Sequence, residues 1–305
     1  MFQKKLSYQK IRKKYLRFLK SQEVLSEPFR DKLGQLDDFF LPISKKIYKI
    51  FLKNKKTKII GLTGSQGSGK STISNILKII LKDGFNLNTV VFSIDDFYKT
   101  LKERRKMSKK ISPLFLTRGV PGTHDTKLLF DSLKKFKNLK FNNFSIPRFD
   151  KSSDERHAKN KWQKIKKKPH LIIFEGWCVG ARHQKNDDLE KSMNQIERKN
   201  DTDFTWRKTV NYQLKHKYKK IFKKIDKLIY LKAPSFKDIF KWRLLQEQKM
   251  KLTSKSKKIM SKSQVKEFIM FYERITRHMM KDYSKISDLT IFLDKNHRST
   301  KMKFY

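Results

Sequence analysis

One glycine-rich octapeptide has the residue types and the spacing needed to bind the phosphates of a nucleotide. Residues 64–71 read Gly64-Ser65-Gln66-Gly67-Ser68-Gly69-Lys70-Ser71 and fit G-x-x-x-x-G-K-[ST] without departure. Glycines let consecutive backbone N–H groups turn toward an anion, because a Cβ would block that path. The helix expected to begin at Lys70 directs its positive end to the same place. We therefore predict that this loop, with Thr72, binds ATP, with Lys70 on the β- and γ-phosphates and the Ser71 hydroxyl on Mg²⁺.

Carboxylates follow two of the apolar strands expected further along the chain. Asp95 and Asp96 come after TVVFSI at 89–94, at the carboxyl end where α/β sheets bind ligands. Phosphoryl transfer to an alcohol benefits from a carboxylate that orients the hydroxyl and takes its proton, whereas a protein that only binds ATP has no need of one. One of the two aspartates is expected to cap the following helix instead. Glu175 ends the strand LIIF and is the candidate for holding Mg²⁺.

The elements that position these residues alternate between short apolar strands and helices. Strands are expected at 57–62, 89–94, 171–174, 227–231 and 289–293, and the helix from Lys70 is expected to run to about Lys82, with Gly84 as its C-terminal cap. Such alternation predicts an α/β P-loop kinase fold, with a doubly wound, mainly parallel sheet between helices. We expect a helical extension at 1–52 and a kinase domain at 53–305, which includes a mobile polar insertion at 182–206 and a helical lid at 235–283.

Composition narrows the class of protein and its surroundings. The formal charge of the 305 residues is +46, but lysine is spread along the whole length and no zinc-finger or RNP signature is present. We therefore expect weak polyanion binding and no specific nucleic acid, with a nucleic-acid-binding ATPase as the alternative. The single Cys178 excludes an intrachain disulfide, and no apolar run reaches the length of a membrane span. These features indicate a cytoplasmic protein that acts on a small molecule, with a monomer favoured.

Several further motifs resemble a known family. IDDFYKT at 94–100, RGVPGTHD at 118–125, IPRFDKS at 146–152, FEGWCVGAR at 174–182 and FKWRLLQE at 240–247 occur in the order found in D-glycerate 3-kinases. These enzymes share a P-loop kinase branch with uridine kinase, phosphoribulokinase and pantothenate kinase. The resemblance runs from about residue 57 to the C-terminus and implies ATP-dependent phosphorylation of D-glycerate to 3-phosphoglycerate. The chain departs from the family pattern after residue 182 and at 154–155.

The resemblance also implies roles for single residues. Asp95 matches the catalytic carboxylate of the branch, and Arg243 matches an arginine of the lid helix that closes over the phosphates. Residues on the acceptor side would be Asp96, Arg118, His124, Asp125 and Arg148.

The chemistry of glycerate agrees with two of these assignments. A small carboxylate needs a fixed guanidinium for bidentate binding, which Arg118 and Arg148 can supply, whereas a nucleoside needs aromatic stacking. Uridine, pantothenate and another sugar acid remain the alternative acceptors.

Overall fold

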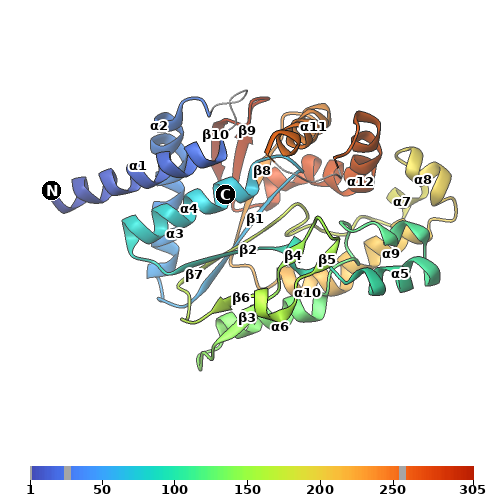
Figure 1. Cartoon of the computed structure of the whole chain (residues 1–305), viewed down its shortest axis with the longest axis horizontal. Helices are drawn as coiled ribbons and strands as arrows, with labels where there is room; N and C mark the ends of the chain where they lie inside the picture. The colour runs from blue at the N-terminus through green and yellow to red at the C-terminus, as the bar shows by residue number, and fades with distance from the viewer. Residues whose placement is uncertain (1, 24–28, 254–258) are drawn as a thin grey trace.

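A six-stranded sheet forms the centre of the protein, in the order β10-β9-β8-β1-β7-β2 (Figure 1). The computed structural model describes residues 2–23, 29–253 and 259–305, and for 2–6 and 252–253 the backbone only. Five strands pair in parallel: β1 (Lys58–Gly64), β2 (Thr89–Ser93), β7 (Leu171–Gly176), β8 (Lys227–Lys232) and β9 (Leu289–Leu293). This arrangement confirms the predicted fold class.

The sixth strand was not predicted from the sequence. Strand β10 (Ser299–Phe304) pairs antiparallel with β9, so β10 and not β9 forms this edge of the sheet. Its residues STKMKF are mostly polar and exposed, because an antiparallel edge strand can face water. A strand of that kind lacks the apolar run that identified the other five.

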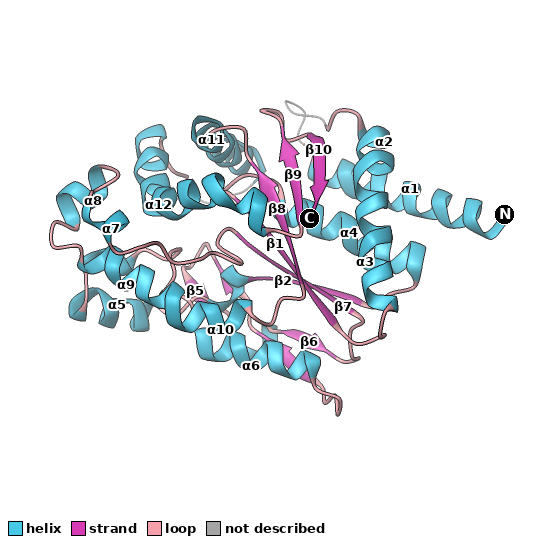
Figure 2. Cartoon of the chain, turned by 180° about the vertical axis from the view of Figure 1, so that it is seen from behind, coloured by secondary structure: helices cyan, strands magenta, loops and turns pink. Residues whose placement is uncertain are grey.

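Helices cover both faces of the sheet, as the two opposite views show (Figures 1 and 2). Neighbouring residues Ile59 and Ile60 of β1 belong to different apolar cores, since successive side chains of a strand point to opposite faces. The core around Ile60 is completed by α1 (Phe2–Gln22), α3 (Leu41–Leu52), α4 (Lys70–Phe85) and α11 (Phe236–Thr253). The core around Ile59 is completed by α6 (Thr126–Lys137), α9 (Thr205–Gln213), α10 (Lys219–Phe222) and α12 (Lys262–Ile286).

Shorter elements connect these layers. They are α2 (Lys32–Gly34), α5 (Leu101–Lys110), α7 (Asp187–Glu190), α8 (Gln195–Asn200), the 3₁₀ turns η2 (Ile94–Phe97), η3 (Pro113–Leu116) and η4 (Lys159–Lys161), and the π-helical segments η1 (Gln35–Phe40) and η5 (Leu214–Tyr218). Two small antiparallel pairs lie beside the main sheet: β3 (Phe144–Ile146) with β6 (Gln163–Ile165), and β4 (Phe149–Asp150) with β5 (Glu155–Arg156).

Helix α1 packs directly on α4, the helix that follows the phosphate loop. Ile11 of α1 approaches α4 at Gly84, where a Cβ would lie 2.7 Å from the Ile11 Cδ1 atom. The prediction that Gly84 caps this helix was wrong, since α4 continues to Phe85 and Asn86 ends it with φ 52°. Gly84 instead leaves room for the Ile11 side chain of α1.

The segment at 182–206 is folded, contrary to the mobile insertion that its polar sequence indicated. The Arg274 guanidinium of α12 donates to both oxygens of Glu197, at 2.7 and 2.6 Å, and Glu197 is only 1% exposed. Arg207 pairs with Asp201 at 2.9 Å, with both side chains buried. The polar residues of this stretch therefore form internal ion pairs that a reading of polarity alone does not reveal.

The expected lid region at 235–283 corresponds to α11 and α12, and residues 254–258 within it lie outside the described part of the chain. In that described part, no helix is both long enough and apolar enough to cross a membrane.

Candidate active site

The glycine-rich loop joins β1 to α4 and has the form of an anion cradle. Gly67 and Gly69 adopt φ values of 74° and 79°, which L side chains rarely adopt. The hydroxyls of Ser65 and Ser68 are buried and have no hydrogen-bond partner among the described residues. Unpaired polar groups are costly unless a ligand completes them. Together with the start of α4, these groups fit the phosphates of a nucleotide.

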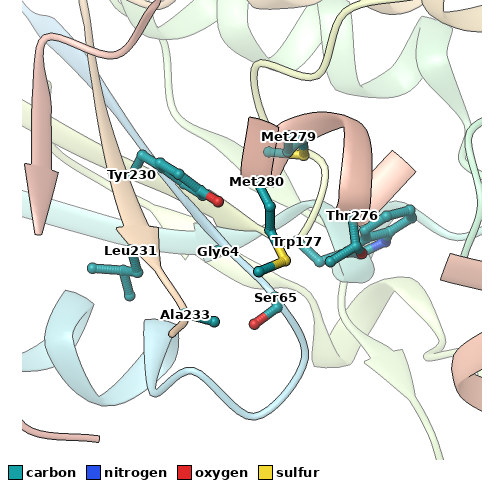
Figure 3. Close-up of a pocket in the computed structure, with 9 residues that line it drawn as sticks. All are labelled: Gly64, Ser65, Trp177, Tyr230, Leu231, Ala233, Thr276, Met279 and Met280. Carbon is teal, nitrogen blue, oxygen red and sulfur yellow. The ribbon is translucent and has the colours of Figure 1, made fainter. Parts of the chain in front are cut away.

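The base of the loop is firmly supported. Trp177 and Tyr230 line a space of about 10 Å³ beside Gly64 and Ser65, together with residues of α12 (Figure 3). A space of this size holds about one water molecule. The residues packed around this space support the loop, and the space itself is too small to bind a substrate.

Lys70 and Ser71 stand at the first turn of α4, as predicted. The Lys70 ammonium donates to the Ser65 carbonyl at 2.7 Å, and burial lowers its pKa. The Ser71 hydroxyl donates to Glu175 Oε1 at 3.0 Å. Burial raises the pKa of Glu175, while the Lys70 charge opposes that shift.

The pair of oxygen donors from Ser71 and Glu175 fits the needs of Mg²⁺. This ion is commonly held by one or two protein oxygens and completes its shell with water and substrate phosphates. Within the described residues, no three His, Cys, Asp or Glu side chains gather as a metal site of their own. A magnesium ion here would therefore share its coordination with the nucleotide.

A pocket of about 560 Å³ adjoins the phosphate loop and could hold the rest of the nucleotide. Trp242 and Gln246 of α11 line one side, and the 295–299 turn lines another. Tyr15 and Gln35 of the extension also line the pocket, and Gln35 exchanges two hydrogen bonds with the backbone of Ser299, at 2.8 and 2.9 Å. No sequence pattern predicted this contribution, because it depends on packing between distant segments.

Two glycines of the loop offer a matched test. A Cβ on Gly67 would lie 2.8 Å from the Trp242 Cβ atom, whereas a Cβ on Gly69 would meet no atom within 4 Å. Alanine at either position carries a conformational cost of about 1–2 kcal/mol, because φ is positive. Gly67→Ala should cost a further ~1–3 kcal/mol, because Trp242 must move. Denaturant unfolding of the two variants measures the difference, and equal losses would contradict this packing of α11 on the loop.

A second pocket of about 310 Å³ lies beside the carboxyl ends of β2 and β7 and suits a small acceptor. Asp95 borders it from η2, where its Oδ1 accepts from the Tyr98 hydroxyl at 2.9 Å and its Oδ2 from Lys151 Nζ at 2.7 Å. Burial raises the pKa of Asp95, but the charge and hydrogen bond of Lys151 outweigh it, with help from Tyr98, and lower that pKa to about 2. Asp95 is therefore ionised at neutral pH.

Asp96 and Arg148 line the same pocket. Asp96 Oδ2 accepts from the Ser93 backbone N–H at 3.2 Å, so this is the aspartate that caps the turn. Arg148 donates to Asp96 at 3.1 Å and to Gln163 Oε1 at 2.7 Å. Burial raises the pKa of Asp96, although the Arg148 charge acts against it. The Arg148 guanidinium is thereby held in place at the edge of the pocket.

The other three residues expected on the acceptor side do not border this pocket among the described residues. Arg118 pairs with Asp154. His124 is 1% exposed, its ring stacks on Tyr98, and burial lowers its pKa to about 4. Asp125 caps α6 through the Leu128 N–H at 3.0 Å. Each therefore already has a role in holding the loops, and direct contact with an acceptor stays a prediction.

Arg243 lies on α11 and is paired with Glu247 one turn along the helix. Its guanidinium also lies over the Phe268 ring, 5.1 Å from the centroid. Both contacts lie within the helical region, and the lid role of Arg243 stays a prediction.

Sequence reasoning missed Lys151, Lys78 and Gln163, which all line the acceptor pocket. Lys151 stood in the IPRFDKS motif, which offered a signal. No sequence signal identified Lys78 or Gln163. Lys78 is one of several lysines on α4, and Gln163 lies on the short strand β6.

Comparison with known proteins agrees with this geometry. Residues 59–184 match the model of the Phosphoribulokinase / Uridine kinase family. The chain is 35% identical over 253 residues to the uncharacterized kinase mug58 of Schizosaccharomyces pombe, covering 75% of this chain and 85% of that protein. It is 27% identical over 222 residues to the chloroplastic D-glycerate 3-kinase of Arabidopsis thaliana, covering 70% of this chain and 46% of that one.

A solved structure shares the fold. D-glycerate 3-kinase from Cryptococcus neoformans superposes with a TM-score of 0.72 at 22% identity, covering 87% of this chain and 97% of the other. A phosphate loop at the head of a parallel sheet, with carboxylates at neighbouring strand ends, defines an ATP-dependent P-loop kinase for small molecules. The chain belongs to the phosphoribulokinase/uridine kinase family.

Proposed function

We propose that this kinase transfers the γ-phosphoryl group of ATP to the 3-hydroxyl of D-glycerate and forms 3-phosphoglycerate. The observation that carries this proposal is the small acceptor pocket. Asp95 lines it together with two cations, Arg148 and Lys151. Its volume of about 310 Å³ suits a small molecule. Its lining includes the cations Lys78, Arg148 and Lys151, which can pair with an anionic acceptor. The D-glycerate 3-kinase among the relatives supports the same choice.

The residues of the chain divide the work of the reaction. The loop amides and Lys70 bind the phosphates, and Arg148 binds the carboxylate of the acceptor. Asp95 Oδ2 orients the hydroxyl and takes its proton as the new O–P bond forms and the bond to ADP breaks. Ser71 and Glu175 would hold the magnesium ion, which neutralises phosphate charge when bound. Arg243 is the proposed cation of the closed lid.

An acceptor screen tests this function. Purified protein with Mg²⁺ and ATP should release ADP with D-glycerate and much more slowly with uridine, pantothenate or ribulose 5-phosphate. A preference for any of those three would replace glycerate as the acceptor. Equal ADP release in the absence of any acceptor would favour an ATPase instead.

Removal of one guanidinium should act on the acceptor alone. In Arg148→Gln the charge-assisted bond to the carboxylate is lost, which is worth about 1.5–3 kcal/mol. The KM for D-glycerate should therefore rise roughly tenfold or more, while the KM for ATP stays within about twofold. Arg105→Gln, which changes an exposed arginine of α5, serves as the control. An unchanged KM for glycerate in Arg148→Gln would mean that the carboxylate binds elsewhere.

A further inference from the structure

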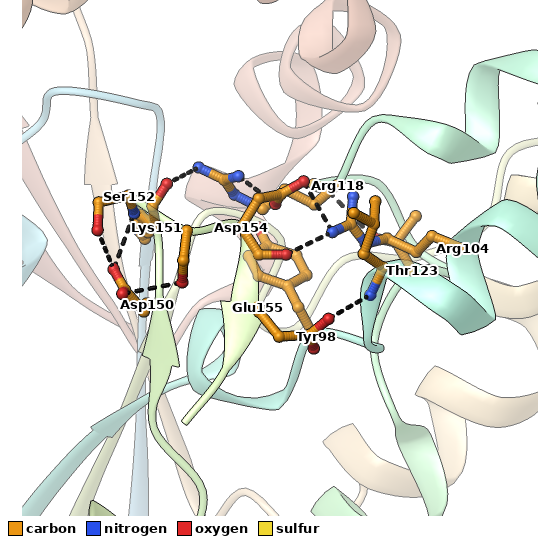
Figure 4. A network of polar contacts seen from close by, with 12 residues as sticks. Tyr98, Arg104, Arg118, Thr123, Asp150, Lys151, Ser152, Asp154 and Glu155 are labelled. Carbon is orange, nitrogen blue, oxygen red and sulfur yellow. Dashed lines mark hydrogen bonds and ion pairs between the residues drawn. The ribbon is translucent and has the colours of Figure 1, made fainter. Parts of the chain in front are cut away.

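Lys151 is the first residue of the turn between β4 and β5 (Figure 4), and its side chain lines the acceptor pocket. Its ammonium donates to Asp95 Oδ2 at 2.7 Å, and the Tyr98 hydroxyl donates to Oδ1 at 2.9 Å. Both oxygens of the proposed base are thus occupied. Each carboxylate oxygen can accept a second hydrogen bond, but the ammonium on Oδ2 competes with an acceptor hydroxyl and weakens Asp95 as a base.

The two partners differ in their freedom to move. Tyr98 is 3% exposed and stacks on His124 with ring centroids 4.5 Å apart. The Lys151 side chain is 62% exposed in its ion pair. Asp95 is only 24% exposed in the same pair, so the lysine is the more accessible partner, and it carries its charge on a flexible stem. Lys151 is therefore the partner that can leave.

The backbone beneath Lys151 is held in place by two arginines. Arg104, only 1% exposed, donates to the Asp154 carbonyl at 3.0 Å and pairs with the Asp154 carboxylate at 2.9 Å. Arg118 pairs with the same carboxylate and donates to the Lys151 carbonyl at 3.3 Å. Asp150 accepts from the Ser152 N–H at 2.9 Å (Figure 4). The turn therefore fixes the start of the side chain, while the flexible stem allows the ammonium to exchange one partner for another within the pocket.

An anionic acceptor supplies the competing charge. Arg148 and Lys151 line the same pocket, and the Arg148 guanidinium is already held by Asp96 and Gln163. A carboxylate bound at Arg148 would attract the mobile ammonium of Lys151. A neutral alcohol of the same size offers no such attraction.

We propose that Lys151 links turnover to the negative charge of the acceptor, because a bound carboxylate draws its ammonium away from Asp95 and opens Oδ2 to the hydroxyl. This role rests on the proposed function and makes Lys151 a positioning and specificity residue. Arg104 and Arg118 would then contribute indirectly, because they hold the turn that carries Lys151.

Glycerol is the matched neutral acceptor, because a CH₂OH group replaces the carboxylate of glycerate. In Lys151→Met, kcat/KM for D-glycerate should fall, because its carboxylate loses a cation. The kcat/KM for glycerol should stay at the wild-type value or rise, because no ammonium competes for Asp95. The ratio of the two should drop about tenfold or more, the loss expected for one charge-assisted contact. Lys151→Arg keeps the charge and should retain most of the ratio. Lys161→Met removes an exposed lysine outside the pocket and should match the wild type.

The outcomes separate the two proposals. If wild-type protein does not phosphorylate D-glycerate, the proposed function fails and this role of Lys151 fails with it. If wild-type protein does so, but Lys151→Met lowers both acceptors equally or keeps the ratio, only the role of Lys151 is overturned. A melting temperature equal to that of the wild type shows that the variant is folded.

Discussion

Lys70→Ala should lose nearly all turnover and keep the wild-type fold. Lys70 follows the cradle of Gly67 and Gly69, and its ammonium bonds only to the Ser65 carbonyl within the loop. Among the described residues it belongs to neither apolar core, and its proposed role is to bind the phosphates. Steady-state kinetics with ATP and the acceptor measure the loss, and thermal melting measures the fold.

Lys82→Ala is the control for this change, because Lys82 is an exposed lysine on the same helix. It should leave kcat unchanged. If Lys70→Ala kept more than about a tenth of wild-type kcat, the difference in activation free energy would be only about 1.4 kcal/mol. Such a small effect would contradict the assignment of this loop to phosphate binding.

Asp95→Asn should lower kcat by about 10²–10⁴-fold, the range typical for loss of a general base. The amide keeps the size of the side chain but cannot take the proton of the hydroxyl. The phosphate loop is untouched, so the KM for ATP should stay near the wild-type value. Steady-state kinetics with both substrates varied separate these quantities.

The neighbouring residue provides the comparison. Asp96 caps the Ser93 backbone and binds Arg148, so Asp96→Asn should cost less in kcat than Asp95→Asn. A variant of Asp95 that turns over within about threefold of wild type would remove it as the base, since a general base typically contributes at least 10²-fold.

The parts that were predictable from the sequence have strong local signals. The phosphate loop needs particular residues at fixed spacing, and buried parallel strands are continuous apolar runs, as in β1 and β7. The aspartates at 95 and 96 were placed correctly because the carboxyl end of β2 follows directly from its sequence. Local sequence patterns were therefore enough to predict the fold and the candidate phosphate-binding loop.

The acceptor half depends on contacts that local patterns do not encode. Lys151 pairs with Asp95, which lies 56 positions earlier in the sequence. Arg118 pairs with Asp154. His124 turned out to be buried against Tyr218, at 2.6 Å from its hydroxyl. A charged residue beside a glycine-rich loop looks the same in sequence whether it binds a ligand or holds a turn, so only the structure separates the two.

The identity of the phosphorylated product is the most direct test of the proposed reaction. Wild-type protein should convert ATP and D-glycerate to ADP and phosphoglycerate in equal amounts. The phosphoglycerate should be a single isomer. In a proton-coupled ³¹P NMR spectrum, the phosphorus of a 3-phosphate couples to the two protons of the CH₂ group and appears as a triplet, whereas a 2-phosphate couples to a single proton. The account predicts the triplet, formed by the wild type and at most in traces by Asp95→Asn. A doublet, or ADP without any phosphorylated acceptor, would contradict it.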